Sequence, residues 1–502
     1  MGGFAGTTSQ GGRAGFTGGG TTGGDSAEAG DSGASGDAGA SGDAGAGPES
    51  PSTIHLANLL IEPNPAMSIS CYVSWTTAVP ASSAVEFGEG TYAFRIRDDA
   101  LVTNHRVLVI GMHADTSYLV KAVSANDEGS GSAAGTFTTG SLPASLPLPT
   151  LTADNFGESQ TGWTLMNLQV VGASVPARIV MFDEQGLPVW YFIQGTHADG
   201  RGDIATEFYD GRVFVGPAPQ EPARVVALSG EVLWAGPPNS TSPEQTHSFS
   251  QLSTGNYLLD MELPGTAQDS PRIKDQLLQE IAPDWSVVWS WKMFDHVPKA
   301  SPRYELCHGN ALSVDEATNM AYFNCRYLGV FKIDRSSGDI VWRLGGTFDS
   351  TTLGPGDFTF EPPEAQFSDI HAPKFYADGT VLVYDNGGYF NLAQGTVYHS
   401  RVLEYRLDEV GMKATRTFEF PGDFPVGDWY ENDWYTPIWG DADRQPNGNI
   451  LITAGTRQPD ANTRIIEITR TGKVVWELIF PVSIGAYRAQ RLSPPPLVER
   501  LP

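Results

Sequence analysis

Three histidines share one position in an internal repeat of the chain. His247 lies eight residues before Gly255, and His371 lies eight residues before Gly379. His308 opens a similar segment with a longer turn. Nine of the 502 residues are histidine, so chance places one at a given position only about 2% of the time. Because imidazole donates, accepts or attacks near neutral pH, we expect the three rings to line one site.

An arginine and an asparagine are expected beside these histidines. Arg326 ends a strand that returns toward His308, and Asn310 shares a strand face with His308. Arginine offers a fork of N–H donors that suits the oxygens of an anionic tetrahedral group. Three histidines also match a zinc site in number, but an arginine among the ligands would repel the cation. The cluster therefore predicts anion chemistry without a metal, with three channel histidines of no chemical role as the alternative.

Strand pairing is expected to bring three more polar residues toward the histidines. Antiparallel hairpins return Asp385 and Asn386, which are candidates for substrate binding, toward His371, and Glu262 toward His247.

A repeating strand pattern predicts the element that positions the histidines. An apolar strand, a turn and an aromatic-ended strand recur, ending at Trp190, Trp234, Trp289, Trp342, Phe418 and Trp476. Each unit also contains an earlier hairpin, which gives four strands at a spacing of roughly fifty residues. Such units predict an all-β chain with a six-bladed β-propeller over 151–492. The recurring aromatic residue is expected to pack neighbouring blades, and the histidines to open the strands along the central channel.

The residues before and after the propeller differ from it in composition. Short alternating strands over 52–140 predict a small β-sandwich, in which Tyr118 resembles the tyrosine corner of fibronectin type III domains. Residues 1–51 are rich in Gly, Ser, Ala and Asp and predict a disordered tether. Residues 141–150 predict a Pro-stiffened linker, and residues 493–502 a C-terminal tail.

Charge and hydropathy narrow the possible partners and location. The formal net charge of −27 argues against nucleic acid and anionic membrane surfaces as partners, and favours small molecules. No run of eighteen apolar residues exists, so we expect no transmembrane segment. No leader appears at the start, and we expect any export signal to have been removed. The tether is similar to those that hold exported bacterial proteins away from the envelope, which predicts an extracytoplasmic location.

At the candidate site the chain resembles the PAPS-independent arylsulfate sulfotransferases. The matching motifs are CHGNA at 307–311, Arg326 before YLGVFKID, HAPKFYADGTVLVYDNG from His371, SRVLEYRLD, RQPNGNILITAG, GKVVWE and YRAQR. The resemblance covers most of 151–491. It implies a six-bladed propeller that transfers a sulfuryl group from an aryl sulfate donor to a phenolic acceptor through a sulfated histidine, without nucleotide, metal or other cofactor.

The resemblance also implies a role for each residue of the cluster. His371 would be the nucleophile, and Arg326 and Asn310 would hold sulfuryl oxygens. His308 and His247 would complete the pocket, one of them as proton donor to the departing phenolate.

The chain departs from the family beside the candidate nucleophile. The family commonly places Gln and Asp there, whereas this chain has Ile370 and Ala372. That difference leaves the orientation of His371 open. Asp385 is the carboxylate expected to fix the tautomer of the ring in their place.

Aromatic residues are candidates for substrate binding. Tyr389 and Phe390 follow the DNG motif, and segment 427–440 contains five aromatic residues, Trp434 among them. These side chains are suited to stacking on phenolic rings, and packing between blades explains them equally well.

Two further questions stay open at the level of sequence. Cys307 and Cys325 precede His308 and Arg326 on paired strands, where a disulfide and two free thiols are equally compatible with the spacing. The alternative functions are a metal-dependent propeller hydrolase or lyase that uses the same histidines, and a non-catalytic extracellular binding module.

Overall fold

The computed structural model confirms the all-β class. It describes residues 52–171, 177–194, 206–217, 221–239, 243–264, 274–298, 307–345, 356–387, 400–422, 435–457 and 459–501. The described residues form seven sheets and two short 3-10 helices, η1 (Met293–Asp295) and η2 (Pro363–Ala365). The predicted tether, residues 1–51, lies outside the described residues. None of the described helices is long and apolar enough to cross a membrane.

The first sheet is built mainly from the N-terminal part of the chain. Its strands are β1 (Ser52–Thr53), β2 (Leu56–Pro63), β3 (Cys71–Gly88), β4 (Phe94–Val109), β5 (Ser117–Asn126), β6 (Gly129–Thr138) and β34 (Glu499–Arg500). Alternate residues of β3, including Cys71, Val73 and Trp75, are buried, as their spacing predicts. The Tyr118 hydroxyl accepts a hydrogen bond from the backbone N–H of His113 at 2.8 Å. The relation to fibronectin type III domains stays a prediction.

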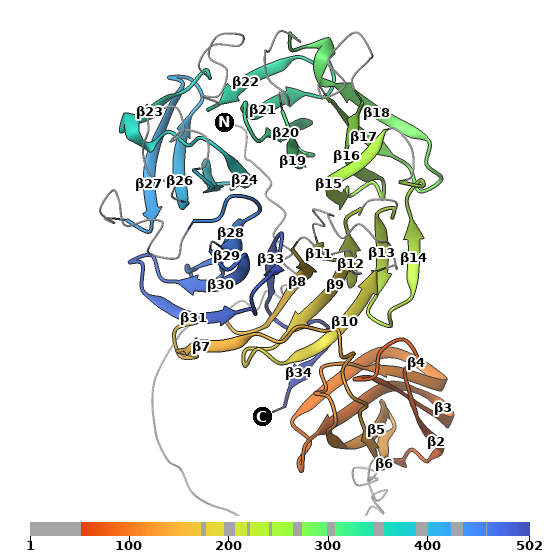
Figure 1. Cartoon of the computed structure of the whole chain (residues 1–502). Helices are drawn as coiled ribbons and strands as arrows, with labels where there is room; N and C mark the ends of the chain where they lie inside the picture. The colour runs from red at the N-terminus through yellow and green to blue at the C-terminus, as the bar shows by residue number, and fades with distance from the viewer. Residues whose placement is uncertain are drawn as a thin grey trace, which may run out of the picture.

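The other six sheets surround a common axis and form the propeller, as Figure 1 shows. The first three contain β8 (Trp163–Val170), β9 (Ala177–Phe182), β10 (Pro188–Gln194), β32 (Ile484–Gly485) and β33 (Ala489–Leu492); β11 (Thr206–Tyr209), β12 (Arg212–Val215), β13 (Arg224–Ala227) and β14 (Val232–Ala235); and β15 (Glu244–Gln251), β16 (Tyr257–Leu263), β17 (Asp275–Ile281) and β18 (Val287–Lys292). The last three contain β19 (Gly309–Asp315), β20 (Met320–Cys325), β21 (Gly329–Asp334) and β22 (Ile340–Leu344); β23 (Thr359–Glu361), β24 (Ile370–Phe375), β25 (Thr380–Asp385), β26 (Arg401–Asp408) and β27 (Lys413–Phe420); and β28 (Asp441–Arg444), β29 (Ile450–Arg457), β30 (Asn462–Ile468), β31 (Val474–Ile479) and β7 (Thr150–Asp154).

Both ends of the propeller sequence close the ring. Strand β7 adds to the edge of the last blade by pairing with β31, and β33 adds to the first blade by pairing with β8. The predicted C-terminal tail, residues 493–502, contains one short strand, β34. Strand β34 pairs with β4, so the chain returns to the first sheet after it leaves the propeller.

The recurring tryptophans join neighbouring blades. Each of Trp190, Trp234, Trp289 and Trp476 lies in the fourth-strand position of its blade and donates its indole N–H to a backbone carbonyl of the next blade, at 2.8–3.0 Å. The aromatic ring packs at the interface while its polar edge reaches a turn. The packing role predicted for this position is therefore confirmed for these four tryptophans.

The first sheet contacts the first blade through polar groups. His113 Nε2 lies 2.9 Å from a carboxylate oxygen of Asp183 in the first blade. The Ser68 backbone N–H donates to the Tyr191 hydroxyl at 2.9 Å. These contacts attach the sheet to the side of the propeller.

Candidate active site

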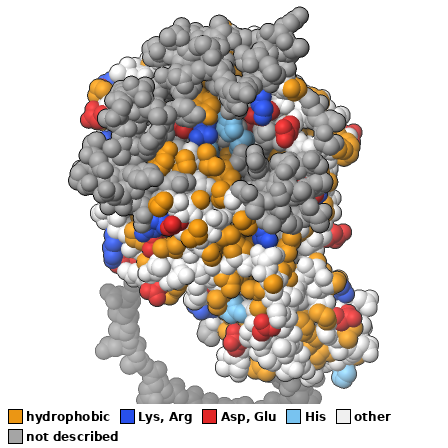
Figure 2. All heavy atoms as spheres, viewed as in Figure 1, with side chains coloured by type: hydrophobic (Ala, Val, Ile, Leu, Met, Phe, Trp, Pro, Cys, Tyr) orange, Lys and Arg blue, Asp and Glu red, His pale blue; other side chains and the backbone are white. Residues whose placement is uncertain are grey.

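The three histidines lie on, or directly before, the innermost strands of three successive blades. His247 lies in β15, His308 immediately precedes β19, and His371 lies in β24. Figure 2 shows histidine and basic side chains near the middle of the propeller face.

Each of these strands is irregular at the site. The pairing register shifts between Thr246 and Phe249 in β15, between Gly309 and Ala311 in β19, and between His371 and Lys374 in β24. A bulge turns a side chain away from the regular alternation, so it can aim these residues at the channel.

Left-handed backbone accompanies the irregular pairing. His308 has φ 56° and Ala372 has φ 48°, although neither is glycine. Non-glycine residues adopt this conformation only when the surrounding structure holds them there, and such residues concentrate at functional sites.

The structure brings the predicted histidines together around a tyrosine. The ring centroids of His247 and His308 are 5.0 Å apart. The ring of Tyr487 lies 5.6 Å from His247 and 6.1 Å from His371. Three blades therefore deliver imidazole rings to one region of the channel, as the repeat predicts.

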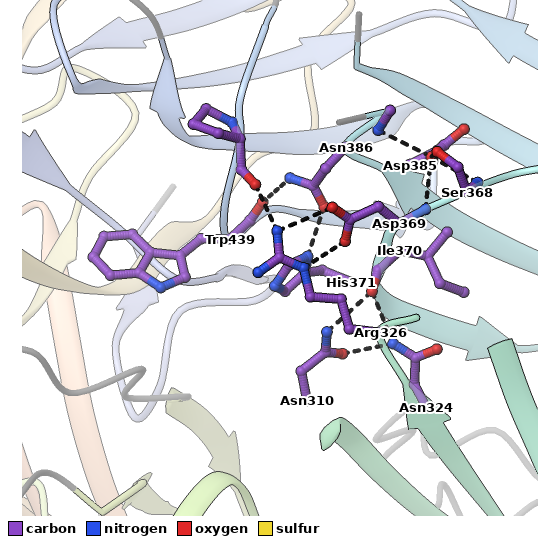
Figure 3. A network of polar contacts seen from close by, with 12 residues as sticks. Asn310, Asn324, Arg326, Ser368, Asp369, Ile370, His371, Asp385, Asn386 and Trp439 are labelled. Carbon is purple, nitrogen blue, oxygen red and sulfur yellow. Dashed lines mark hydrogen bonds and ion pairs between the residues drawn. The ribbon is translucent and has the colours of Figure 1, made fainter. Parts of the chain in front are cut away.

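The tautomer of His371 follows from its neighbour Asn386. Nδ1 of His371 lies 2.6 Å from Oδ1 of Asn386, as Figure 3 shows. The Asn386 amide nitrogen donates to the backbone oxygens of Thr436 and Trp439 at 2.7 and 2.8 Å. Because two carbonyls face the amide nitrogen, the amide oxygen must face the ring and accept from Nδ1–H. The lone pair of neutral His371 then lies on Nε2.

Burial keeps the His371 ring neutral. The side chain is 1% exposed. Desolvation, and after it the nearby Arg326 guanidinium, lower the pKa of His371 well below its ordinary value of 6.5, while the Asn386 hydrogen bond opposes the shift. The imidazole is therefore unprotonated and nucleophilic at neutral pH.

A buried carboxylate orients Arg326. Nε and Nη2 of Arg326 donate to the two carboxylate oxygens of Asp369 at 2.5 and 3.0 Å, and Nη2 also donates to the Pro437 carbonyl at 2.8 Å. The backbone N–H of Arg326 donates to the carbonyl of His308, which confirms the predicted return of this strand. Figure 3 shows the guanidinium beside the His371 ring. A forked ion pair of this kind fixes the plane of the guanidinium.

Asn310 links two of the blades. Its amide nitrogen donates to the carbonyl of Ile370 at 3.0 Å, and its amide oxygen accepts from Asn324 at 2.7 Å. The Tyr487 hydroxyl donates to the backbone carbonyl of Asn310 at 2.8 Å. The Asn310 side chain, which was predicted to hold an anion, thus fixes the strand end that carries His371.

The expectation that Asp385 fixes the His371 tautomer is wrong. The Asp385 carboxylate accepts hydrogen bonds from Arg401, Ser368 and the backbone N–H of Gly387. It braces the backbone on either side of the site, whereas Asn386, one residue later, faces the ring. The alternation of a strand ends at Asp385, so the sequence did not show which of the two side chains turns inward.

The two cysteines are joined. Cys307 and Cys325 form a disulfide with Cα atoms 4.7 Å apart. The bond connects the residues that immediately precede His308 and Arg326, so it holds the two site residues on one hairpin.

Two residues of the site were missed in the sequence. Tyr487 lies in the YRAQR motif, but only the closed ring reveals that its side chain enters the channel. Asp369 lies two residues before His371, and the arginine that it orients is 43 residues away. The predicted substrate-binding residues Tyr389 and Trp434, and also Phe390, lie outside the described residues.

The residues that the structure describes contain no group of three or more His, Cys, Asp or Glu side chains placed to hold a metal ion.

The segment of the chain that contains the site matches a known protein family. A model of the arylsulfotransferase family (ASST) matches residues 158–488, which include every residue of the network described above. No curated protein matches the chain.

The solved structures that resemble this chain are only distantly similar to it. A protein of unknown function from Bacteroides caccae is 13% identical, covers 65% of this chain and 99% of that chain, and has a TM-score of 0.40. The β-propeller domain of Cps50 (Swd1) from Myceliophteria thermophila is 8% identical, with coverages of 70% and 99% and a TM-score of 0.39. At these scores the likeness does not bear on function.

Proposed function

Because the chain belongs to the arylsulfotransferase family, whose members act on aryl sulfates and phenols, we propose that His371 is the residue that carries the sulfuryl group between them. The observation that supports this role is the fixed tautomer of His371. Its Nδ1–H is held by Asn386, its ring is neutral, and Nε2 keeps the lone pair that attack requires.

The first half of the reaction forms the His371 Nε2–sulfur bond and breaks the bond between sulfur and the aryl oxygen. Charge on a transferred group of this kind spreads over its equatorial oxygens, by analogy with phosphoryl transfer. Arg326, oriented by Asp369, is the fixed cation near His371 that stabilises those oxygens. His308 or His247 supplies the proton to the departing phenolate. In the second half an acceptor phenol takes the sulfuryl group and returns the proton.

The same proposal extends to substrates and location. The donors are small aryl sulfates and the acceptors are phenols, and the residues of the site perform the transfer without a nucleotide. We place the protein outside the cytoplasm, as secreted, periplasmic or envelope-tethered, since the Cys307–Cys325 disulfide is typical of oxidising compartments.

Trapping of the covalent intermediate tests the proposal. The protein is incubated briefly with 4-nitrophenyl sulfate and no acceptor, and peptide mass mapping then locates the added sulfuryl group. We expect the label on His371 and a burst of about one phenol per protein. The variant His371→Gln should lose both, whereas His296→Gln, at an exposed histidine stacked on Trp291, should keep both. Phenol release from a protein whose His371 stays unlabelled would refute the role.

A further inference from the structure

A second polar cluster lies on the face of β16 that packs against β19. Asp260 and Glu262 are two residues apart and point to the same face of β16, and Gln276 pairs directly with Glu262. Gln276 Oε1 accepts the backbone N–H of Gly309 at 3.2 Å, so this face adjoins the residue after His308. All three cluster side chains are buried.

Several polar atoms of this cluster have no hydrogen-bond partner within the described part of the chain. They are both carboxylate oxygens of Asp260, Oε1 of Glu262 and Nε2 of Gln276. The Thr246 hydroxyl, across the strand pair, donates to the backbone oxygen of Asp260 at 3.3 Å, and Thr246 has a small lowering effect on the pKa of the Asp260 carboxyl. Buried polar groups are nearly always satisfied by protein or water, so four such atoms in one cluster are unusual for the interior of a sheet.

The charged and titratable groups near Asp260 lie on four segments of the chain. Glu262 lies on the same strand and is paired with Lys274, His247 follows Thr246 on β15, His308 precedes β19, and Arg488 follows Tyr487. Burial, with the charge of Glu262 as a second cause, raises the pKa of Asp260 to about 8, and His308 and Arg488 oppose that rise. Asp260 therefore keeps its proton at neutral pH.

We propose that Asp260 stores the proton that His308 passes to the leaving phenolate. The inference rests on the proposed function of His371. As the bond between sulfur and the aryl oxygen breaks, His308 protonates that oxygen and Asp260 reprotonates His308, which leaves an Asp260 carboxylate. In the second half-reaction the acceptor phenol gives its proton to His308 and thereby back to Asp260, so the enzyme ends each cycle unchanged. Asp260 is a proton-relay residue that acts through His308.

Leaving groups of different acidity separate this role from a structural one. A nitro-substituted phenolate leaves without a proton, whereas unsubstituted phenolate, whose conjugate acid has a pKa near 10, depends on one. The measurement is the rate of His371 sulfation in a single turnover with 4-nitrophenyl sulfate and with phenyl sulfate. In Asp260→Asn we expect the ratio of the first rate to the second to rise by about 100-fold. The variant Asp315→Asn makes the same change at the far end of β19 and should leave the ratio as in the unmodified protein.

A second variant tests the relay through the pH dependence of the sulfation rate. Removing the charge of Glu262 should lower the pKa of Asp260, so Glu262→Gln should move the alkaline limb of the phenyl sulfate profile to lower pH. An equal loss of rate on both donors in Asp260→Asn, or an unmoved limb in Glu262→Gln, would overturn the relay. Absence of sulfated His371 in the unmodified protein would instead overturn the proposed function.

Discussion

The hydrogen bond between Asn386 and His371 predicts a specific loss of rate when its acceptor is removed. The substitution Asn386→Leu keeps the approximate size of the side chain but removes the acceptor at Nδ1. A buried N–H without an acceptor costs about 1–3 kcal/mol, so the ring shifts to the other tautomer by that margin. The nucleophilic form is then depleted, and His371 sulfation should slow by about 5- to 150-fold.

The same substitution should weaken the structure by a separate amount. Asn386 makes three side-chain hydrogen bonds, one with His371 and two with the carbonyls of Thr436 and Trp439. At about 1 kcal/mol each, their loss lowers the free energy of unfolding by about 3 kcal/mol. Denaturant unfolding of each variant measures this loss, and single-turnover rates are taken where both proteins are fully folded.

The comparison variant is Asn386→Asp, which keeps an acceptor at Nδ1. Its carboxylate stabilises the charged ring, so the pKa of His371 should rise and the acid limb of the rate should move to higher pH. Above that limb the rate should exceed that of Asn386→Leu by about tenfold. Equal rates for the two variants at alkaline pH would show that Asn386 only supports the backbone and does not set the tautomer.

Three further predictions concern other contacts. Reduction of the Cys307–Cys325 disulfide, which spans 18 residues, should lower the free energy of unfolding by about 3 kcal/mol, measured by denaturant unfolding with and without reductant. The hydrogen bond to Asp183 raises the pKa of His113, so its stabilisation is complete below about pH 6.5 and is lost as pH rises through the higher folded value. Melting curves against pH should show that dependence, and His113→Gln should lack it. Replacement of Asp369 by Asn leaves a buried guanidinium without its carboxylate, which should cost about 3 kcal/mol or more of stability and about a hundredfold in sulfation rate.

Repetition carried most of the fold information in the sequence. An aromatic residue in one phase of each unit, and histidines in another, are local patterns that depend on strand period and turn spacing. They predicted the propeller, the innermost position of His247, His308 and His371, and the return of Arg326 toward His308. Strand pairing is a near-neighbour property, so it can be read from such spacing.

The sequence alone also predicted the chemical character of the site, since histidines and an arginine at one phase of a repeat suit an anionic group. Tertiary structure decided which side chains touch. Whether Asp385 or Asn386 faces His371 depends on where β25 stops alternating, and the role of Tyr487 depends on closure of the ring between β33 and β8. Bulges and left-handed residues such as Ala372 leave no periodic signal, because packing from neighbouring blades imposes them. The proposed relay has the same origin, because only the packing of two neighbouring blades brings the face of β16 that carries Asp260 toward the segment that contains His308.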